Sequence, residues 1–229
     1  MKNTILTLLA ITGFASGAVT FQSAAPDVNN DDIFNSVYDR NDKFYADTLN
    51  IGQSFTTGND ASGYTVNSVS FQLNSSSQFN SDGSPKTQNF TFNLRLVEID
   101  PDNINVNTIY MQRGISISGA TWSQGDWMTV GFDTQYPFDL LDANTMYGID
   151  LEMTGAGSWK NGIPYTNYNR SDVYAGGYRY SFADGASTIN AYTGTDRAFH
   201  VDLAANSIPE PSAMLLGGIG TLLLLRRKR

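Results

Sequence analysis

Apolar and polar residues alternate along much of the chain, in short runs that place one class on each side of an extended backbone. A period of two with one apolar face indicates antiparallel β-strands packed over a core. Six runs show it, centred on Val69, Phe71 and Leu73; Phe90, Phe92, Leu94 and Leu96; Met128, Val130 and Phe132; Tyr147, Ile149, Leu151 and Met153; Tyr178, Tyr180 and Phe182; and Phe199, Val201 and Leu203.

Stretches rich in Asn, Asp, Ser, Gly and Pro separate these runs, for example residues 74–85 and 100–107. No long amphipathic helix stands between them. The pattern predicts an all-β domain over residues 19–203, an antiparallel two-sheet β-sandwich of jelly-roll-like type. Residues 204–208 would be a linker, and the two ends of the chain have a different character.

The first eighteen residues have the layout of a signal peptide. Lys2 supplies a short positive region, residues 5–14 are apolar, and Ser16, Gly17 and Ala18 are small. The apolar run is too short for a membrane span. We expect this signal to direct export of the domain, and signal peptidase to cleave after Ala18.

The last twenty-one residues form a three-part tail. Pro209, Glu210 and Pro211 precede an apolar run over residues 212–225, and the chain ends in four basic residues, Arg226, Arg227, Lys228 and Arg229. Fourteen helical residues span roughly 21 Å, short of a hydrocarbon core of about 30 Å. A short hydrophobic helix with a cytoplasmic basic end predicts a transient anchor, with the domain on the periplasmic side.

This tail resembles the PEP-CTERM sorting signal. The resemblance implies that an exosortase-type membrane enzyme recognises Pro209, Glu210 and Pro211. It also implies an inner-membrane-anchored intermediate that is later moved to the cell surface or extracellular matrix. The resemblance covers about a tenth of the chain.

A second resemblance concerns the domain. Residues 52–58, Gly-Gln-Ser-Phe-Thr-Thr-Gly, precede a strand expected near Tyr64, and residues 138–140, Phe-Asp-Leu, lead to residues 144–147 and another strand. This order is similar to choice-of-anchor domains, which resemble galactose-binding jelly rolls.

Charge and cysteine content exclude several functions. When Lys2, Glu210 and the four terminal basic residues are set apart, 9 basic and 21 acidic residues remain, a charge of about −12. This acidity argues against nucleic acid as a partner. The chain has no cysteine, which excludes thiol nucleophiles and thiolate metal sites.

Catalytic groups are few. The single histidine, His200, is out of phase with Phe199 and Val201, so we expect a surface histidine rather than a triad member with Asp202. Glu98 and Glu152 are the glutamates of the predicted domain. Glu98 would point inward or be turned out by a bulge. A glycoside hydrolase-like enzyme using Glu98 and a second carboxylate is therefore a distant alternative to a non-catalytic protein.

Oxygen-rich clusters raise the question of a metal. No cofactor is expected, but a structural calcium ion is the alternative to solvated turns. The candidate ligands are Asp27, Asn29, Asn30, Asp31 and Asp32 in one cluster, and Asp100, Asp102, Asn103 and Asn105 in the other.

Aromatic residues gather late in the chain among amides and charges. Such rings can stack on sugar faces, or they can pack internally. We expect Tyr178 and Tyr180 in the core, and Trp122 and Trp127 as hydrophobic plugs beside a turn. The candidate glycan-binding residues are Trp159, Tyr165, Tyr168, Arg170 and Tyr174.

The sequence therefore predicts an exported surface or matrix protein, non-catalytic, with an extracellular polysaccharide as its candidate ligand. The alternative is a purely structural envelope or matrix protein.

Overall fold

The computed structural model describes residues 19–43, 45–46, 49–74, 90–102, 104–117, 122–132, 141–153, 165–183 and 185–206. These residues form two antiparallel sheets and contain no helix. The predicted signal peptide, its cleavage site at Ala18, and the tail from Pro209 to Arg229 with its expected helix lie outside the described ranges.

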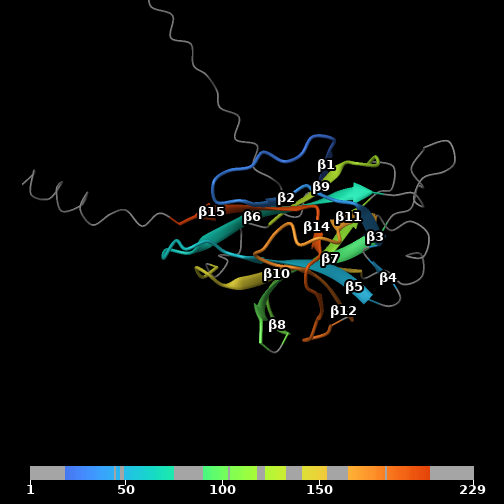
Figure 1. The fold of residues 1–229 in the computed structure, drawn as a ribbon. Helices are drawn as coiled ribbons and strands as arrows, with labels where there is room; N and C mark the ends of the chain where they lie inside the picture. The colour runs from blue at the N-terminus through green and yellow to red at the C-terminus, as the bar shows by residue number, and fades with distance from the viewer. Residues whose placement is uncertain are drawn as a thin grey trace, which may run out of the picture.

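The first sheet has eight strands: β1 (Val19–Gln22), β2 (Ile33–Asn35), β3 (Arg40–Lys43), β6 (Tyr64–Asn74), β9 (Trp127–Gly131), β11 (Tyr165–Asn169), β14 (Asp196–Arg197) and β15 (Phe199–Ala205). The second has seven: β4 (Tyr45–Ala46), β5 (Leu49–Thr56), β7 (Phe90–Asp100), β8 (Asn105–Ile117), β10 (Met146–Met153), β12 (Arg179–Phe182) and β13 (Asn190–Tyr192). Figure 1 shows the two groups as layers.

The alternating runs of the sequence are strands. They correspond to β6, β7, β9, β10, β12 and β15, which confirms the period-two interpretation. One boundary differs, because β15 continues to Ala205, two residues beyond the predicted end of the domain. Ala204 and Ala205 pair with Thr65 and Tyr64, so backbone hydrogen bonding extends the strand where side-chain alternation had weakened.

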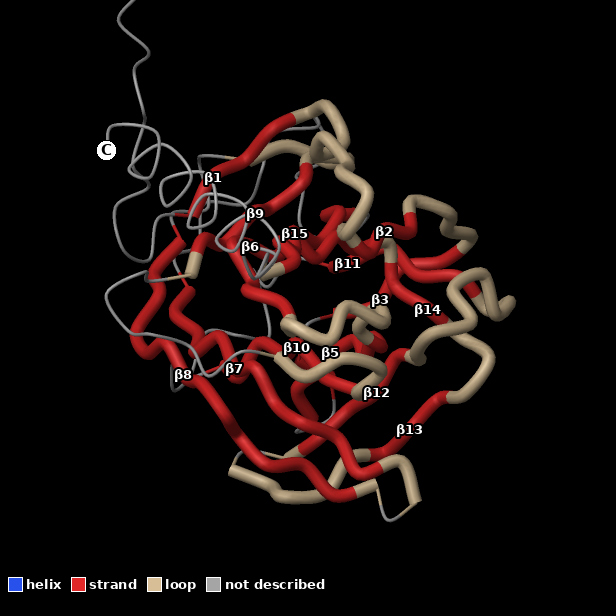
Figure 2. The backbone as a smooth tube through the Cα atoms, turned by 90° about the vertical axis from the view of Figure 1, so that its left-hand side faces the viewer, coloured by secondary structure: helices blue, strands red, loops and turns tan. Residues whose placement is uncertain are grey.

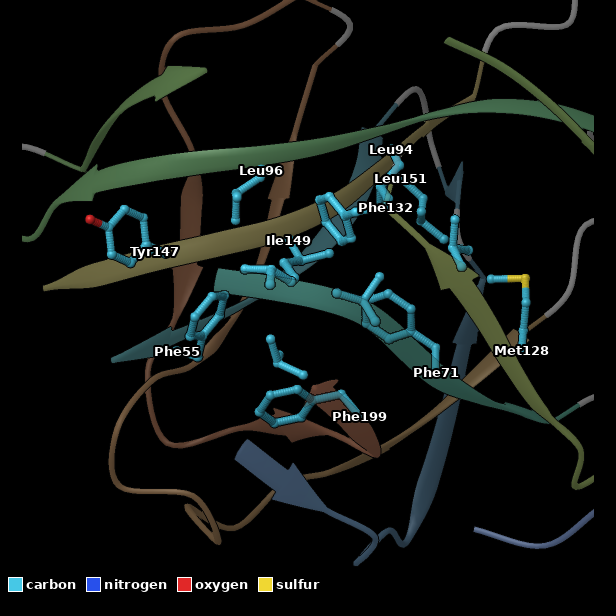
Figure 3. Packing of buried hydrophobic residues seen from close by; sticks show 14 of the residues in the cluster. Phe55, Phe71, Leu94, Leu96, Met128, Phe132, Tyr147, Ile149, Leu151 and Phe199 are labelled. Carbon is cyan, nitrogen blue, oxygen red and sulfur yellow. The ribbon is translucent and has the colours of Figure 1, made fainter. Parts of the chain in front are cut away.

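The main core lies between the sheets. Phe71, Val69 and Phe199 come from the first sheet, and Leu94 and Ile149 from the second. Figure 3 shows Phe71 and Phe199 meeting Leu94 and Ile149 in the space between the strands. Trp122 and Trp127 are buried on either side of the turn at Gln124 and Gly125, as the sequence predicts.

The seven-stranded sheet also buries part of its other face. Figure 2 shows its strands curving from β8 and β7 through β10 and β5 to β12 and β13. The segment after β12 crosses to the start of β8. There Val106 N donates a hydrogen bond to Ser187 O (2.8 Å), and Asn105 forms an isolated antiparallel β-bridge with Thr188. The enclosed second core contains Val97, Ile99, Tyr180, Phe182 and Ile189.

Two glycines make room for the largest side chain of this second core. A Cβ atom at Gly52 or Gly148 would lie 2.3–2.5 Å from the Tyr180 ring or its hydroxyl. Gly52 of β5 pairs with Tyr180, and Gly148 lies on β10, the next strand beyond β5. Their lack of a side chain therefore lets the tyrosine lie flat on the sheet.

Candidate functional site

A stack of three side chains joins the two sheets at one end. Arg179 on β12 lies over the ring of Tyr168 on β11, with its guanidinium carbon 4.2 Å from the ring centroid. The same carbon lies 4.5 Å from the ring centroid of Tyr192 on β13. Both distances suit cation–π attraction. Tyr192 is 39% exposed and its hydroxyl is 3.1 Å from Ser181 Oγ, so the stack reaches the surface.

A buried polar network supports this stack from within. Gln53 Nε2 donates to Asp196 Oδ1 (3.1 Å), and Arg197 N donates to Gln53 Oε1 (2.8 Å). The Arg197 guanidinium donates to Thr166 Oγ1 and, at 3.3 Å, to Gly52 O. Burial raises the pKa of Asp196, against the hydrogen bonds it accepts. This end of the space between the sheets is thus polar, unlike the main core. Hydrogen bonds fix the orientation of its polar side chains.

Exposed residues of β3 and β11 adjoin the stack. Arg40 pairs with Tyr168 across the two strands, so both side chains lie on the same face. Asp39 N donates to Tyr168 O (3.1 Å), and Arg170 N donates to Asp39 Oδ1 (3.2 Å). Arg40 and Arg170 are exposed, and Tyr38, next to Asp39, is 46% exposed. We call Tyr38, Arg40, Tyr168, Arg170, Arg179 and Tyr192 the rim.

The rim contains some of the residues that the sequence singled out. Tyr168 is half-buried in the stack and Arg170 is exposed. Tyr165 begins β11, and Trp159 lies outside the described residues. No sequence pattern pointed to Arg40, Arg179 or Tyr192, because they are distant in the chain and meet only through strand pairing.

Tyr174 does not belong to this surface, which corrects the prediction of a glycan-binding ring there. Its ring packs edge-on against Phe199 of the main core, with centroids 5.5 Å apart. Thr56 N donates to the Tyr174 hydroxyl (3.2 Å). Burial raises the pKa of this tyrosine. The surrounding glycines and asparagines indicated an exposed loop, but Asp196 Oδ2 accepts hydrogen bonds from the amides of Val173 and Tyr174 and holds the loop against the sheet.

The two glutamates lie on opposite faces of the second sheet. Glu98 pairs with Tyr147 of the main core, so it is on the core side, where it is exposed at the end of the strand. Glu152 pairs with Asn93 on the other face and is buried. It accepts hydrogen bonds from Asn93 Nδ2 and Gly185 N, both 2.9 Å long. Carboxylates separated by a sheet cannot flank one glycosidic bond.

His200 is buried, and the expectation of a surface histidine is wrong. Its side chain is 4% exposed, Nε2 lies 3.0 Å from Asp32 Oδ2, and its ring packs edge-on against Phe34. The partner is Asp32 rather than Asp202, which accepts a hydrogen bond from Asn67. Strand alternation correctly placed His200 away from the main core, but Phe34 of β2 and Asp32 of the segment before it pack against the imidazole on that face.

Carboxylates of the acidic cluster around Asp32 accept hydrogen bonds from the backbone of β15. Asp32 Oδ1 accepts a hydrogen bond from Leu203 N (2.9 Å), at the bulge after Asp202, and Asp31 Oδ2 accepts one from Ala205 N (3.3 Å). Asp100 likewise accepts from the amide of Asp102 in its own turn. These carboxylate oxygens therefore accept hydrogen bonds from backbone amides. Among the described residues, no three or more His, Asp or Glu side chains are grouped so that they could bind a metal ion.

A buried ion pair lies in the second core. Arg95 Nε and Nη2 donate to the two carboxylate oxygens of Asp150, at 2.8 and 3.1 Å. Tyr180 donates to Asp150 Oδ2 (3.1 Å), and the Arg95 guanidinium lies 4.2 Å from the centroid of the Phe182 ring.

Burial raises the pKa of Asp150 to about 6, although Arg95 and Tyr180 act in the opposite direction. Desolvation lowers the pKa of Arg95, but the hydrogen bond and charge of Asp150 outweigh it and raise that pKa. Asp150 is fully buried, so this pair contributes to the interior rather than to a surface site.

The described ranges contain no helix long and apolar enough to cross a membrane. The run predicted to do so, residues 212–225, lies outside them.

No protein-family model matches the chain, and no curated protein matches it by sequence. One similar solved structure holds the cysteine protease and lectin-like domains of Cwp84, a surface layer associated protein of Clostridium difficile. It is 6% identical, covers 79% of this chain and 37% of that chain, and has a TM-score of 0.43. The clostridial cysteine protease Cwp84 after propeptide cleavage is 7% identical over 80% of this chain and 42% of that chain, with a TM-score of 0.47. The chain spans less than half of either protein, and at these TM-scores neither similarity bears on its chemistry.

Proposed function

We propose that the chain is an exported surface or matrix protein, sorted by an exosortase-type enzyme at Pro209, Glu210 and Pro211. Two ordered signals support this, one at each end of the sequence. Signal peptidase would act first, at Ala18. The short hydrophobic helix would then hold the domain, a jelly-roll-like sandwich, on the periplasmic side until transfer.

The domain acts as a non-catalytic glycan-binding module in this proposal. The observation that carries it is the stack of Tyr168, Arg179 and Tyr192, which ends in an exposed ring. An aromatic face offers an apolar surface to a sugar ring, and neighbouring donors can bind hydroxyl groups. The separation of Glu98 from Glu152 by a sheet argues against glycoside hydrolysis through this pair.

A purely structural envelope or matrix protein is the second candidate. The packing of Tyr174 against Phe199 favours it, because it removes one predicted ligand contact and uses the ring for stability. Under this alternative, the rim only joins the two sheets.

Glycan binding by the full chain, purified in detergent, separates these candidates. We expect Tyr192→Ala to weaken binding to a retained polysaccharide about tenfold, equivalent to about 1.4 kcal/mol, because the exposed ring is lost. Ile109→Ala, an exposed apolar residue of β8, is the control and should change nothing. Absence of binding to every extracellular polysaccharide tested would leave the structural alternative.

Sorting is tested separately by mass spectrometry of surface protein from cells with and without the sorting enzyme. Processing predicts loss of the basic terminus only where the enzyme is present. Mature surface protein that still ends at Arg229 would contradict it.

A further inference from the structure

Arginines gather at the rim of an otherwise acidic protein. The chain has a formal net charge of −8, yet Arg40, Arg170 and Arg179 lie together where β3, β11 and β12 meet. Asp39 and Asp172 are also exposed there. The three arginines outnumber these two aspartates, so this end is less acidic than the chain as a whole. An acidic ligand repelled by the rest of the surface would be steered to this end.

The rim arginines differ from the buried ones in what they bind. Arg95 and Arg197 are buried and donate to Asp150, Thr166 and Gly52. The Arg40 and Arg170 side chains are exposed, and neither makes a hydrogen bond or ion pair within the described part of the chain. Their donors therefore face solvent. A guanidinium group matches carboxylate and sulfate oxygens with two parallel hydrogen bonds.

Aromatic rings flank these charges. Tyr192 and Tyr38 are exposed, and the Arg179 guanidinium lies over the rings of both Tyr168 and Tyr192. An acidic polysaccharide presents the two complementary groups, flat sugar faces and regularly spaced anions. A neutral glycan would use the rings but would leave the arginine donors bound to water.

We propose that the rim binds an acidic polysaccharide, with Arg40 and Arg170 pairing with its carboxylate or sulfate groups while Tyr192 stacks on a sugar ring. This assignment rests on the proposed glycan-binding function and specifies its ligand class. Because charge-assisted contacts at an exposed surface are screened by salt, binding should weaken as ionic strength rises.

The test measures binding of the full chain to four polymers: polygalacturonate, its carboxyl-reduced form, dextran sulfate and neutral dextran. We expect binding to one or both acidic polymers and at least about tenfold weaker binding to their neutral counterparts. Preference for polygalacturonate over dextran sulfate would identify carboxylate as the bound anion, and the reverse would identify sulfate. The double variant Arg40→Gln/Arg170→Gln should lose about tenfold in affinity for the acidic polymer. Circular dichroism checks that the variant keeps its fold.

Arg113→Gln, on β8 of the other sheet, is the matched control for the single variants Arg40→Gln and Arg170→Gln, because each of the three removes one positive charge. Equal losses in the control and in the two single variants would overturn the proposal, since binding would then follow net charge. Equal binding of acidic and neutral polymers would also overturn it while leaving glycan binding intact. Failure to bind any of these and any neutral extracellular polysaccharide would remove the proposed function as well.

Discussion

One sheet separates two buried regions of opposite chemistry. On one side of β7 and β10, the main core holds Leu94, Leu96 and Ile149, which have no polar side-chain atoms. On the other side, the next residues along the same strands include Arg95 and Asp150, which form an ion pair inside the second core. Both sides exclude water, so polarity alone does not mark the outer face of a strand.

The two regions depend on different kinds of interaction. Hydrophobic packing is non-directional and roughly proportional to buried area, so the main core should tolerate changes that conserve volume. The ion pair depends on donor and acceptor geometry, and desolvating two charges offsets much of their attraction. It is therefore better evidence for a single arrangement of strands than for high stability. Removing one member of the ion pair would nevertheless lower the free energy of unfolding substantially.

The largest expected effect comes from breaking the pair. Asp150→Ala should lower the free energy of unfolding by about 3–5 kcal/mol, because the Arg95 charge stays buried without its carboxylate. Urea denaturation of the full chain measures this. The double variant Arg95→Met/Asp150→Leu should recover most of the loss.

Asp202→Ala is the control for Asp150→Ala. This carboxylate lies on β15, is partly exposed, and accepts an exposed hydrogen bond from Asn67. We expect a loss within about 1 kcal/mol. If Asp150→Ala were no more destabilising than Asp202→Ala, the contrast between the two regions would not hold.

A smaller effect concerns pH. Burial raises the pKa of Asp150 from 3.8 to about 6, so the folded protein holds this proton more tightly than the unfolded chain. The free energy of unfolding should therefore fall as pH rises through this window, by about 2–3 kcal/mol from this group, and stay low above it. Asp150→Asn should remove this component, which urea titrations of both proteins between pH 4 and about 7 would measure. Parallel pH profiles for the two proteins would contradict the assignment.

The smallest effect is expected in the main core. Ile149→Val removes one methylene from a buried side chain and should cost about 0.5–1.5 kcal/mol. Because Ile149 carries no titrating group, the loss in free energy of unfolding should be equal at about pH 4.5 and about pH 7. A pH-dependent loss would mean that the two faces of the sheet are coupled.

Much of the fold follows from the sequence because side-chain alternation is a local property of a strand. Phe71, Leu94 and Val201 are all buried in the main core. The turn between Trp122 and Trp127 lies at Gln124 and Gly125, where the sequence predicts it. The short strands β1 to β4, β13 and β14 could not be predicted this way. A strand of four residues or fewer establishes a period only where flanking residues continue the pattern, as Tyr178 does for β12. Backbone pairing with longer strands therefore defines the other short strands.

The candidate site was only partly accessible from the sequence. Tyr168 and Arg170 were recognised because aromatic and polar residues cluster nearby. Arg179 and Tyr192 were not, because the stack depends on β11 meeting β12 and β13 across two sheets.

The sequence by itself determined which residues of the long strands face the main core, because alternation and apolar transfer free energy act locally. It also carries the two terminal signals on which the sorting prediction rests. The tertiary structure alone decided what covers the other faces. Burial of His200 and Tyr174 and the pairing of Arg95 with Asp150 require segments far apart in the chain to close over a sheet. No local pattern encodes that closure, since it depends on register, sheet curvature and the summed contacts of distant strands.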